Sequence, residues 1–525
     1  MKREIETTGN LQGYSRRSFV IGTGAFTAAA VLGTRVIGAV NSSPKFASYP
    51  FSLGIASGEP TSSGVVLWTR LAPQPLAPGG GMPDEAVEVS YQVSKDEAMS
   101  QIVSSGTVVA VAQWAHSVHV EVGGLEPDRW YWYQFKVGTE VSSKGRTRTL
   151  PLPSVLPDRL RFAFVSCQNY QAGYYTAFEH LAREGADLII HLGDYIYEGG
   201  INKELVRQHN SHEVTTLEEY RARYGLYKSD PLLKKAHEAA PWVVTWDDHE
   251  VAGNYAGKHP KDPVPTEQFM RRRSAAYQAY YEHMPLRVSS LPKGPDLQLY
   301  RGFDYGQLAS FSVLDTRQYR TVQPMDGGNA APSEKLLSPD GTIMGDLQRK
   351  WLFDRMKSSK AVWNVLAQQV MFALVDRKVG PEVEYNMDKW AGYEFERRRL
   401  IRYWQEHEIR NPVVLTGDIH SNWACEIVND FDKEKAKRVA VEFVGTSISS
   451  DGDGEVETKH SRNLVLENPN VKFRNGERGY VMCEVTPKTW KAYYRTVPYV
   501  SRPGAPLNTR ATFVVESGKP QLNQV

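Results

Sequence analysis

Residues 188–197, Leu-Ile-Ile-His-Leu-Gly-Asp-Tyr-Ile-Tyr, combine a short apolar run with an abrupt change to polar and aromatic residues. A short, nearly continuous apolar run is typical of a strand buried on both faces, as in α/β layers with helices outside. Asp194 and Tyr197 come where that strand ends. The stretch therefore predicts an α/β strand whose carboxyl end carries functional residues.

Six further apolar runs follow the same pattern and alternate with segments long enough for helices. They span residues 160–166, 242–246, 308–314, 363–367, 412–416 and 440–444. Helices are predicted over 267–284 and 394–408, and we expect the charged residues Glu396 to Arg399 of the second to face solvent. Together these elements predict an α/β domain over residues 158–510.

The region before this domain has a different pattern. Short alternating strands separated by turn residues occur at residues 64–70, 87–93, 119–122 and 130–137. Regular strands of this kind predict an all-β sandwich, immunoglobulin-like or fibronectin-like, over residues 50–150. The proline-containing segment 150–157 then predicts a linker, because proline removes a hydrogen-bond donor and favours extended backbone before it.

The first forty residues are expected to direct export. Ser15-Arg-Arg-Ser-Phe-Val20 precedes a weakly apolar run rich in Ala, Gly and Thr, and this resembles a bacterial twin-arginine signal. The resemblance implies the Tat translocase as a partner during export and a periplasmic or extracellular location. No run reaches the roughly 18 apolar residues of a membrane-spanning helix, so no stable membrane span is expected.

The amino-acid composition and charge of the chain indicate which classes of partner it binds. The 525 residues carry a formal charge of +2, and the first 40 hold five basic residues against two acidic ones. The remaining chain is therefore close to neutral and lacks the general basic footprint of a nucleic-acid-binding protein. A small-molecule or lipid-sized partner is expected instead. Three cysteines cannot form a disulfide framework, and Cys425 and Cys483 are either core thiols or one disulfide.

Four of the predicted strands end in residues with metal-binding chemistry. The carboxyl ends of strands face the ligand crevice of an α/β sheet, so these ends are expected to converge. The pairs are Cys167 and Asn169, Asp194 and Tyr197, Asp248 and His249, and Asp418 and His420. Taken alone, each residue has an ordinary structural role, such as a buried thiol or a helix cap. Together they provide a bridging carboxylate, an anionic set and an oxygen-rich set, as a two-metal site requires.

This pattern resembles the calcineurin-like metallophosphoesterases, which include purple acid phosphatases, and is most similar to the alkaline phosphatase D (PhoD) family. The resemblance spans roughly residues 50–500 and implies a metallophosphoesterase α/β sandwich domain. Gly193-Asp194-Tyr-Ile-Tyr197 matches Gly-Asp-x-x-Tyr, in which the Asp bridges both metals and the Tyr binds iron. In Asp247-Asp-His-Glu250, Asp248 takes the metal-ligand place and His249 the phosphate-facing place.

Two motifs depart from the superfamily pattern. Asp418 replaces the first His of Gly-His-x-His while His420 keeps the second, and Cys167 and Asn169 replace the Asp and His of Asp-x-His. Aspartate in place of nitrogen ligands favours Ca²⁺, with Mn²⁺ or Mg²⁺ as alternatives. Thiolate and phenolate from Cys167 and Tyr197 suit Fe³⁺, which the family resemblance also implies.

Three other stretches match the family less closely. Gln369 stands near the place of a further His ligand and would bind through its amide oxygen. Residues 315–320 and 388–393 also resemble the family, and their roles are open between the site and loop packing.

The expected chemistry is hydrolysis of phosphate monoesters and diesters by a hydroxide activated between two metals, with phosphate scavenging as its purpose. Asp194 would bridge the metals, Asn169 and His249 would orient the phosphate, and His249 would protonate the leaving oxygen. One alternative is a phospholipase D or phosphodiesterase acting on phospholipid head groups. Another is a binding module on a degenerate phosphatase.

Overall fold

Two large β-sheets packed face to face form the centre of the protein. The computed structural model describes residues 40–429 and 436–525. The predicted export signal, residues 1–40, lies outside the described residues except for Val40. Among the described residues, no helix is both long enough and apolar enough to cross a bilayer.

The first sheet has ten strands in the order β24-β23-β22-β21-β9-β10-β11-β1-β2-β5. Strands β9, β10 and β11 run parallel to one another, and β21 pairs with β9 in the antiparallel direction. The strands are β1 (Ile55–Thr61), β2 (Gly64–Arg70), β5 (Ser117–Val122), β9 (Leu160–Val165), β10 (Leu188–His191), β11 (Trp242–Val244), β21 (Arg478–Val485), β22 (Thr489–Val497), β23 (Asn508–Glu516) and β24 (Lys519–Gln524).

The second sheet has seven strands in the order β12-β13-β15-β17-β19-β18-β20, with β13, β15, β17 and β19 parallel. Its strands are β12 (Arg301–Tyr305), β13 (Ala309–Val313), β15 (Trp363–Ala367), β17 (Pro412–Thr416), β18 (Asn422–Val428), β19 (Arg438–Val444) and β20 (Val471–Asn475). A separate ribbon pairs β14 (Asn329–Ala330) with β16 (Tyr385–Asn386). The predicted α/β strands are thus divided between two sheets.

An apolar layer fills the space between the two sheets. Phe162 of β9 contacts Phe311 of β13 with a ring separation of 5.4 Å, and Trp490 of β22 lies against both Phe162 and Trp363. All of these side chains are buried. This shared core explains why the runs are apolar on both faces: one face meets the other sheet and one meets helices.

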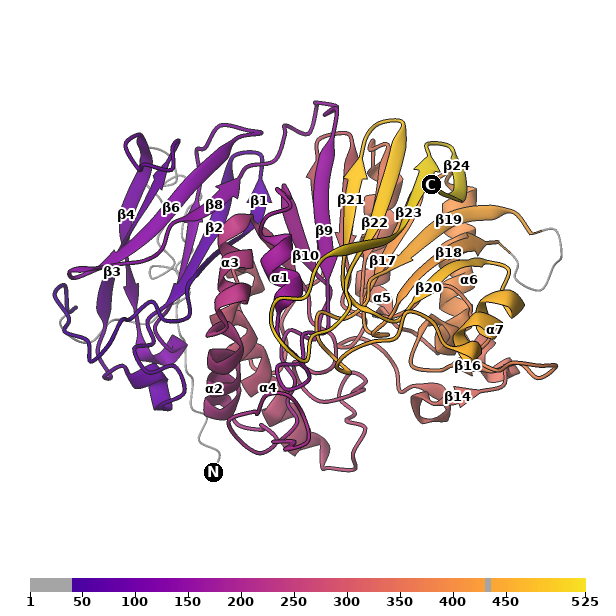
Figure 1. Ribbon diagram of the computed structural model, residues 1–525, viewed down its shortest axis with the longest axis horizontal. Coiled ribbons are helices and arrows are strands. Elements are labelled where there is room, and N and C mark those ends of the chain that lie inside the picture. Colours follow the sequence, from indigo (N-terminus) through magenta and orange to yellow (C-terminus); the bar gives the residue numbers. More distant parts are fainter. Residues whose placement is uncertain (1–39, 430–435) are drawn as a thin grey trace, which may run out of the picture.

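Helices cover the outer face of each sheet (Figure 1). The first sheet is covered by α1 (Thr176–Leu181), α2 (Leu217–Lys228), α3 (Pro231–Ala239) and α4 (Thr266–His283). The second is covered by α5 (Gly345–Ser358) and α6 (Glu394–Glu406), and α7 (Lys459–Glu467) packs beside β20.

The expectation that Glu396 and Arg397 of α6 face solvent is wrong, because both side chains are buried. The Glu396 carboxylate accepts hydrogen bonds from the backbone N–H groups of Ile343 and Met344, and Arg397 pairs with Glu394.

The N-terminal region forms an all-β sandwich. A sheet in the order β4-β3-β6-β7, with β8 paired to β6, packs against β1, β2 and β5 through a separate apolar core. Its strands are β3 (Val87–Ser94), β4 (Ile102–Ala110), β6 (Trp130–Val137), β7 (Glu140–Val141) and β8 (Gly145–Arg148). One layer of this sandwich continues into the ten-stranded sheet, because β1 pairs with β11 at Gly58 and Trp242.

Candidate metal centre

The predicted strand ends meet at one place. Cys167 follows β9, Asp194 follows β10, Asp248 follows β11, and Asp418 and His420 follow β17. The first two loops are joined by backbone hydrogen bonds from Cys167 N to Gly193 O and from Gln168 N to Asp194 O, both 3.0 Å long. The strand ends therefore form a continuous rim on which the polar side chains are fixed.

Gly193 allows two of these loops to approach closely. Its φ is +114°, and a Cβ atom there would lie 2.5 Å from the backbone nitrogen of Asp247. A side chain at this position would both strain the backbone and push the β11 loop away. Steric crowding therefore explains why a glycine precedes Asp194.

Four of the predicted site residues have left-handed backbone conformations: Cys167, Asp194, Asp418 and His420, with φ between +53° and +63°. Non-glycine residues adopt this region infrequently, and such strain concentrates at functional sites. The backbone at the strand ends is therefore arranged to direct these side chains to a common point.

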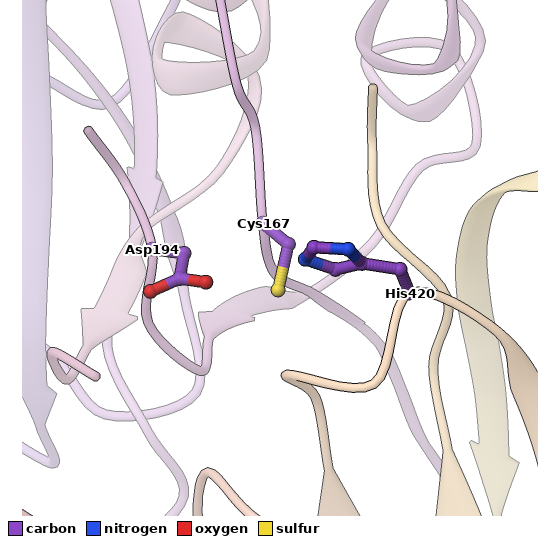
Figure 2. A group of neighbouring side chains, drawn as sticks. All are labelled: Cys167, Asp194 and His420. Carbon is purple, nitrogen blue, oxygen red and sulfur yellow. The ribbon is translucent and has the colours of Figure 1, made fainter. Parts of the chain in front are cut away.

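The first donor group consists of Cys167, Asp194 and His420 (Figure 2). One ligand atom from each, the thiol sulfur, a carboxylate oxygen and a ring nitrogen, lies within 4.8 Å of the others. Tyr197 joins them, because its hydroxyl lies 3.0 Å from Asp194 Oδ2 and 3.1 Å from His420 Nε2. Sulfur, phenol oxygen, carboxylate and imidazole thus converge from three separate loops.

The electrostatics of this group fit a bound cation. Burial raises the pKa of the Cys167 thiol, the Asp194 carboxyl and the Tyr197 phenol well above their ordinary values, and the negative charge of Asp194 raises those of Cys167 and Tyr197 further. Three acidic groups in contact cannot all ionise in a dry site without a positive charge among them. A metal ion provides that charge and favours the deprotonated ligands.

Neighbouring residues fix the orientation of these ligands. Ser450 donates from Oγ to the backbone carbonyl of Cys167 and also lies 2.8 Å from the Tyr197 hydroxyl. Asp451 Oδ2 lies 2.7 Å from His420 Nδ1. A carboxylate on Nδ1 leaves Nε2 free to act as the ligand atom.

The second donor group is rich in oxygen. Asp194, Asp248 and His249 form one cluster of possible ligand atoms, and Asp247, Asp248 and Asp418 form another. Asp247 Oδ2 is buried and has no hydrogen-bond partner among the described residues. Carboxylate oxygens suit hard cations such as Ca²⁺. Asp194 belongs to both donor groups, and Asp248 belongs to both clusters of the oxygen-rich group.

Two cationic side chains lie inside the oxygen-rich group. The buried Arg317 pairs with Asp247, Asp248 and Asp418, and Lys389 pairs with Asp418. Burial raises the pKa of Asp248, but the charges of Arg317 and His249 outweigh this effect and hold it below the ordinary range. The two stretches with open roles, 315–320 and 388–393, therefore both reach the site.

His249 lies over Tyr197 and is held by Glu198. The rings of His249 and Tyr197 stack at a centroid distance of 4.2 Å, and His249 Nδ1 lies 2.7 Å from Glu198 Oε2. Burial lowers the pKa of His249, but Glu198, Asp248 and Asp194 raise it more, so the net shift is well upward. A protonated ring held at Nδ1 can donate a proton from Nε2.

A cavity of about 940 Å³ opens onto the centre. Its lining includes Asn169, Tyr197, Asp248 and His249. The cavity is larger than a phosphate group requires and accommodates the organic part of an ester.

Gln369 does not join either donor group. Its Oε1 accepts hydrogen bonds from the backbone and hydroxyl of Thr316, and its Nε2 donates to Thr245 and to the Leu314 carbonyl. The hydrogen bonds of the Gln369 side chain thus link the ends of neighbouring strands. Cys425 and Cys483 are buried free thiols, which excludes the disulfide alternative.

The sequence interpretation missed several residues that complete the site. These are Glu198, Glu250, Ser450 and Asp451, together with Arg317 and Lys389, whose roles were left open. The Glu250 carboxylate accepts hydrogen bonds from the backbone N–H groups of Asp194 and Asp247 and so holds two of the loops together. Glu198 and Glu250 adjoin recognised motifs, so their acidic character was a usable signal. Ser450 and Asp451 follow the predicted strand 440–444 by several residues, and only the fold brings them to Cys167 and His420.

Comparison with known proteins agrees with this architecture. Residues 162–494 match the model of the PhoD-like phosphatase family, and residues 38–151 match that of the PhoD-like phosphatase N-terminal domain. The chain is 52% identical to alkaline phosphatase D of Bacillus subtilis (strain 168) over 522 residues, covering 98% of this chain and 89% of that protein.

Two solved structures have the same fold as this chain. A structure of PhoD superposes with a TM-score of 0.90 at 53% identity, covering 92% of this chain and 93% of the other. A purple acid phosphatase from yellow lupin (Lupinus luteus) seeds shares the fold, with a TM-score of 0.52 at 11% identity over 88% of this chain and 74% of its own. The chain belongs to the PhoD-like phosphatase family.

Proposed function

We propose that this protein is a metal-dependent phosphatase that hydrolyses phosphate monoesters and diesters. The observation that carries the proposal is the convergence of the Cys167, Asp194, Tyr197 and His420 donor atoms beside a 940 Å³ cavity. Membership of the PhoD-like phosphatase family supports it, as does the name of its 52% identical relative, alkaline phosphatase D.

Fe³⁺ is the proposed occupant of the first donor group. Thiolate, phenolate and carboxylate would give the ion three anionic ligands, and the neutral imidazole of His420 a fourth. Ca²⁺ is proposed for the oxygen-rich group, with Mn²⁺ or Mg²⁺ as alternatives, held by Asp194, Asp248 and Asp418. Asp194 would be shared by both ions.

When bound, the two metal ions would supply Lewis-acid chemistry: they would lower the pKa of a water molecule and neutralise charge that develops on the phosphate. Asn169, which lines the cavity, would orient a phosphate oxygen through its amide. Glu198 would hold the imidazolium of His249 at Nδ1, so that Nε2 could donate a proton to the leaving oxygen.

The cellular role is proposed from the sequence. The twin-arginine motif supports export by the Tat translocase to a periplasmic or extracellular location, where a phosphatase would release phosphate for uptake. We also propose the division into a sandwich at 50–150 and a catalytic domain at 158–510.

The test compares initial rates on p-nitrophenyl phosphate and bis(p-nitrophenyl) phosphate at alkaline pH with calcium, using protein exported in folded form. We expect turnover of both, with the monoester faster. A strong diester preference would favour the phosphodiesterase alternative, and release of head groups from phospholipid vesicles would favour phospholipase D. Absence of turnover on all three by iron-loaded protein would overturn the proposal.

A further inference from the structure

A second cavity, of about 430 Å³, adjoins His420. His420 and Asp451 line this cavity, whereas Asn169 and His249 line the larger one. Its other walls come from β18, β20 and α7, which lie together at one end of the molecule (Figure 1), and from Arg377 in the segment after β15. The donor groups thus adjoin two cavities, and the proposed function uses only the larger.

Three arginines line the smaller cavity, and two of them, Arg377 and Arg474, lie around one aromatic ring. Arg474 of β20 pairs in register with Trp423 of β18, and its guanidinium lies 5.9 Å from the centre of the indole ring. Arg377 lies 5.7 Å from the centre of the same ring. The two side chains are half-buried around one aromatic ring, although they have like charge.

These guanidinium groups have unused hydrogen-bonding capacity. Arg377 Nη1 and Arg474 Nε and Nη1 are buried and have no hydrogen-bond partner, and neither arginine forms an ion pair within residues 40–429 and 436–525. Buried donors without partners are uncommon and costly. Burial lowers the pKa of Arg377, and the charge of Arg474 lowers it further.

The nearby carboxylates compensate these charges only in part: burial lowers the pKa of Arg474, and the charges of Glu455 and Glu457 raise it by less. Asp451 is held by His420, and Asp453 accepts hydrogen bonds from the backbone of Val500 and Ser501. Glu455 is exposed, and no ion pair joins it to either arginine in the described part of the chain. The cavity is therefore lined by two guanidinium groups without ion-pair partners in the described part of the chain, beside the proposed metal ligand His420.

We propose that Arg377 and Arg474 form an anion-binding subsite that takes a second anionic group, phosphate or carboxylate, of a substrate whose first phosphate lies at the metal centre. The planar fork of N–H donors in a guanidinium matches two oxygens of such a group. Arg478 supports this arrangement, because it donates from Nη1 to the His420 carbonyl and so fixes the wall between the subsite and the metal centre. The inference rests on the proposed phosphatase function.

The first experiment uses metal-loaded enzyme and alkanediol bisphosphates with two to six carbons, each compared with the hydroxyalkyl monophosphate of the same length. Calcium is kept in excess, and phosphate release is measured. We expect kcat/KM for at least one bisphosphate to exceed that of its matched monophosphate about 10-fold. An R377Q/R474Q double variant should lose this preference, while its kcat/KM for hydroxyalkyl monophosphates changes less than about 2-fold.

R462Q is the matched control, because Arg462 lies on α7 near the cavity but is exposed and paired with Glu457. It should keep the preference. The subsite is contradicted if no bisphosphate is preferred by the unaltered enzyme, or if the double variant prefers it equally.

A second readout does not depend on turnover. Calorimetric titration of the metal-loaded protein with ethane-1,2-disulfonate should give binding that R377Q/R474Q loses and R462Q keeps. If the enzyme hydrolyses no ester but this difference is seen, the subsite stands and the proposed function fails. If the protein gives no binding heat, or all three proteins bind alike, the arginines serve only to pack against Trp423.

Discussion

The two donor groups of the candidate metal centre differ in how their negative charge is balanced. Around Cys167, Tyr197 and Asp194, no arginine or lysine forms an ion pair within the described part of the chain. Around Asp247, Asp248 and Asp418, Arg317 and Lys389 already provide two positive charges. Among the described residues, the first group thus has only the imidazolium of His249 beside Asp194 as a positive partner. The second group is balanced more fully by the chain itself.

Removing the carboxylate common to both groups should have the largest effect. Asp194→Asn leaves the shape of the side chain but removes the charge that would join the two metals, so kcat should fall at least about 10,000-fold. Circular dichroism should be unchanged. Asp296→Asn, which alters an exposed aspartate, serves as the control. Near-normal turnover of Asp194→Asn would remove the bridging role.

Arg317→Met tests the internal balance of the second group. It leaves buried carboxylates without their cation, and the free energy of unfolding should fall by about 3–5 kcal/mol. Millimolar calcium should restore part of this loss, because binding to the folded state stabilises it. Urea unfolding with and without calcium measures both effects, with the exposed Arg462→Met as control. A loss below about 1 kcal/mol would show that Arg317 is not the balancing charge.

Cys167→Ala tests the dependence of the first group on a metal. The variant should lose iron, and its activity should fall at least about 100-fold while the protein remains folded. Cys483→Ala removes an equally buried thiol far from the site in the sheet and should retain both properties. Iron content by elemental analysis decides the result, and a Cys167→Ala protein that keeps its iron would refute the ligand assignment.

Glu198→Gln weakens the hold on His249 without altering a proposed metal ligand. We expect kcat to fall about 10-fold, with a larger loss for substrates whose leaving group is a poor one, such as an alkyl alcohol. Comparison of nitrophenyl and alkyl phosphates measures this difference. Equal losses for both would indicate that His249 does not protonate the leaving oxygen.

The smallest expected effect concerns Lys228. It tests how much stability the protein loses when a charge is buried without an opposite charge to balance it. Burial lowers its pKa to about 7, and its ammonium group lies 4.2 Å from the centre of the Trp68 ring. Between pH 7 and about 10 the unfolded chain binds this proton more tightly than the folded chain, so its contribution to stability rises with pH.

The gain should be about 1 kcal/mol between pH 7 and pH 8. Lys228→Met should flatten that part of the stability curve relative to the unaltered protein, as measured by urea unfolding at both pH values. Parallel curves for the two proteins would contradict the assigned cause.

Much of this fold could be predicted from local pattern. Strands with apolar residues on both faces were recognisable, and the residues directly after β9, β10, β11 and β17 were identified as the site. This kind of prediction works for a residue whose place in the site is set by the strand directly before it. The split of the strands between two sheets could not be predicted, because a buried run does not reveal which sheet it joins.

Residues that reach the site through tertiary contacts were harder to assign. Arg317 and Lys389 lie on loops whose position is set by neighbours far apart in the sequence, and a charge in a loop normally indicates solvent. Glu396 lies on helix α6, and it was misjudged because its partners are backbone N–H groups more than fifty residues away. The left-handed backbone at Cys167 and Asp418 leaves no trace in residue type.

The pairing of β1 with β11 has a consequence for attempts to isolate the catalytic part. In the whole protein the N-terminal strands cover the edge of β11, although the contact is a single register pair at Gly58 and Trp242. A truncated protein beginning after residue 150 would present β11 as an open edge with unpaired backbone groups, which is a site for strand-to-strand aggregation. The N-terminal sandwich therefore protects the solubility of the enzyme, whatever it does to substrates.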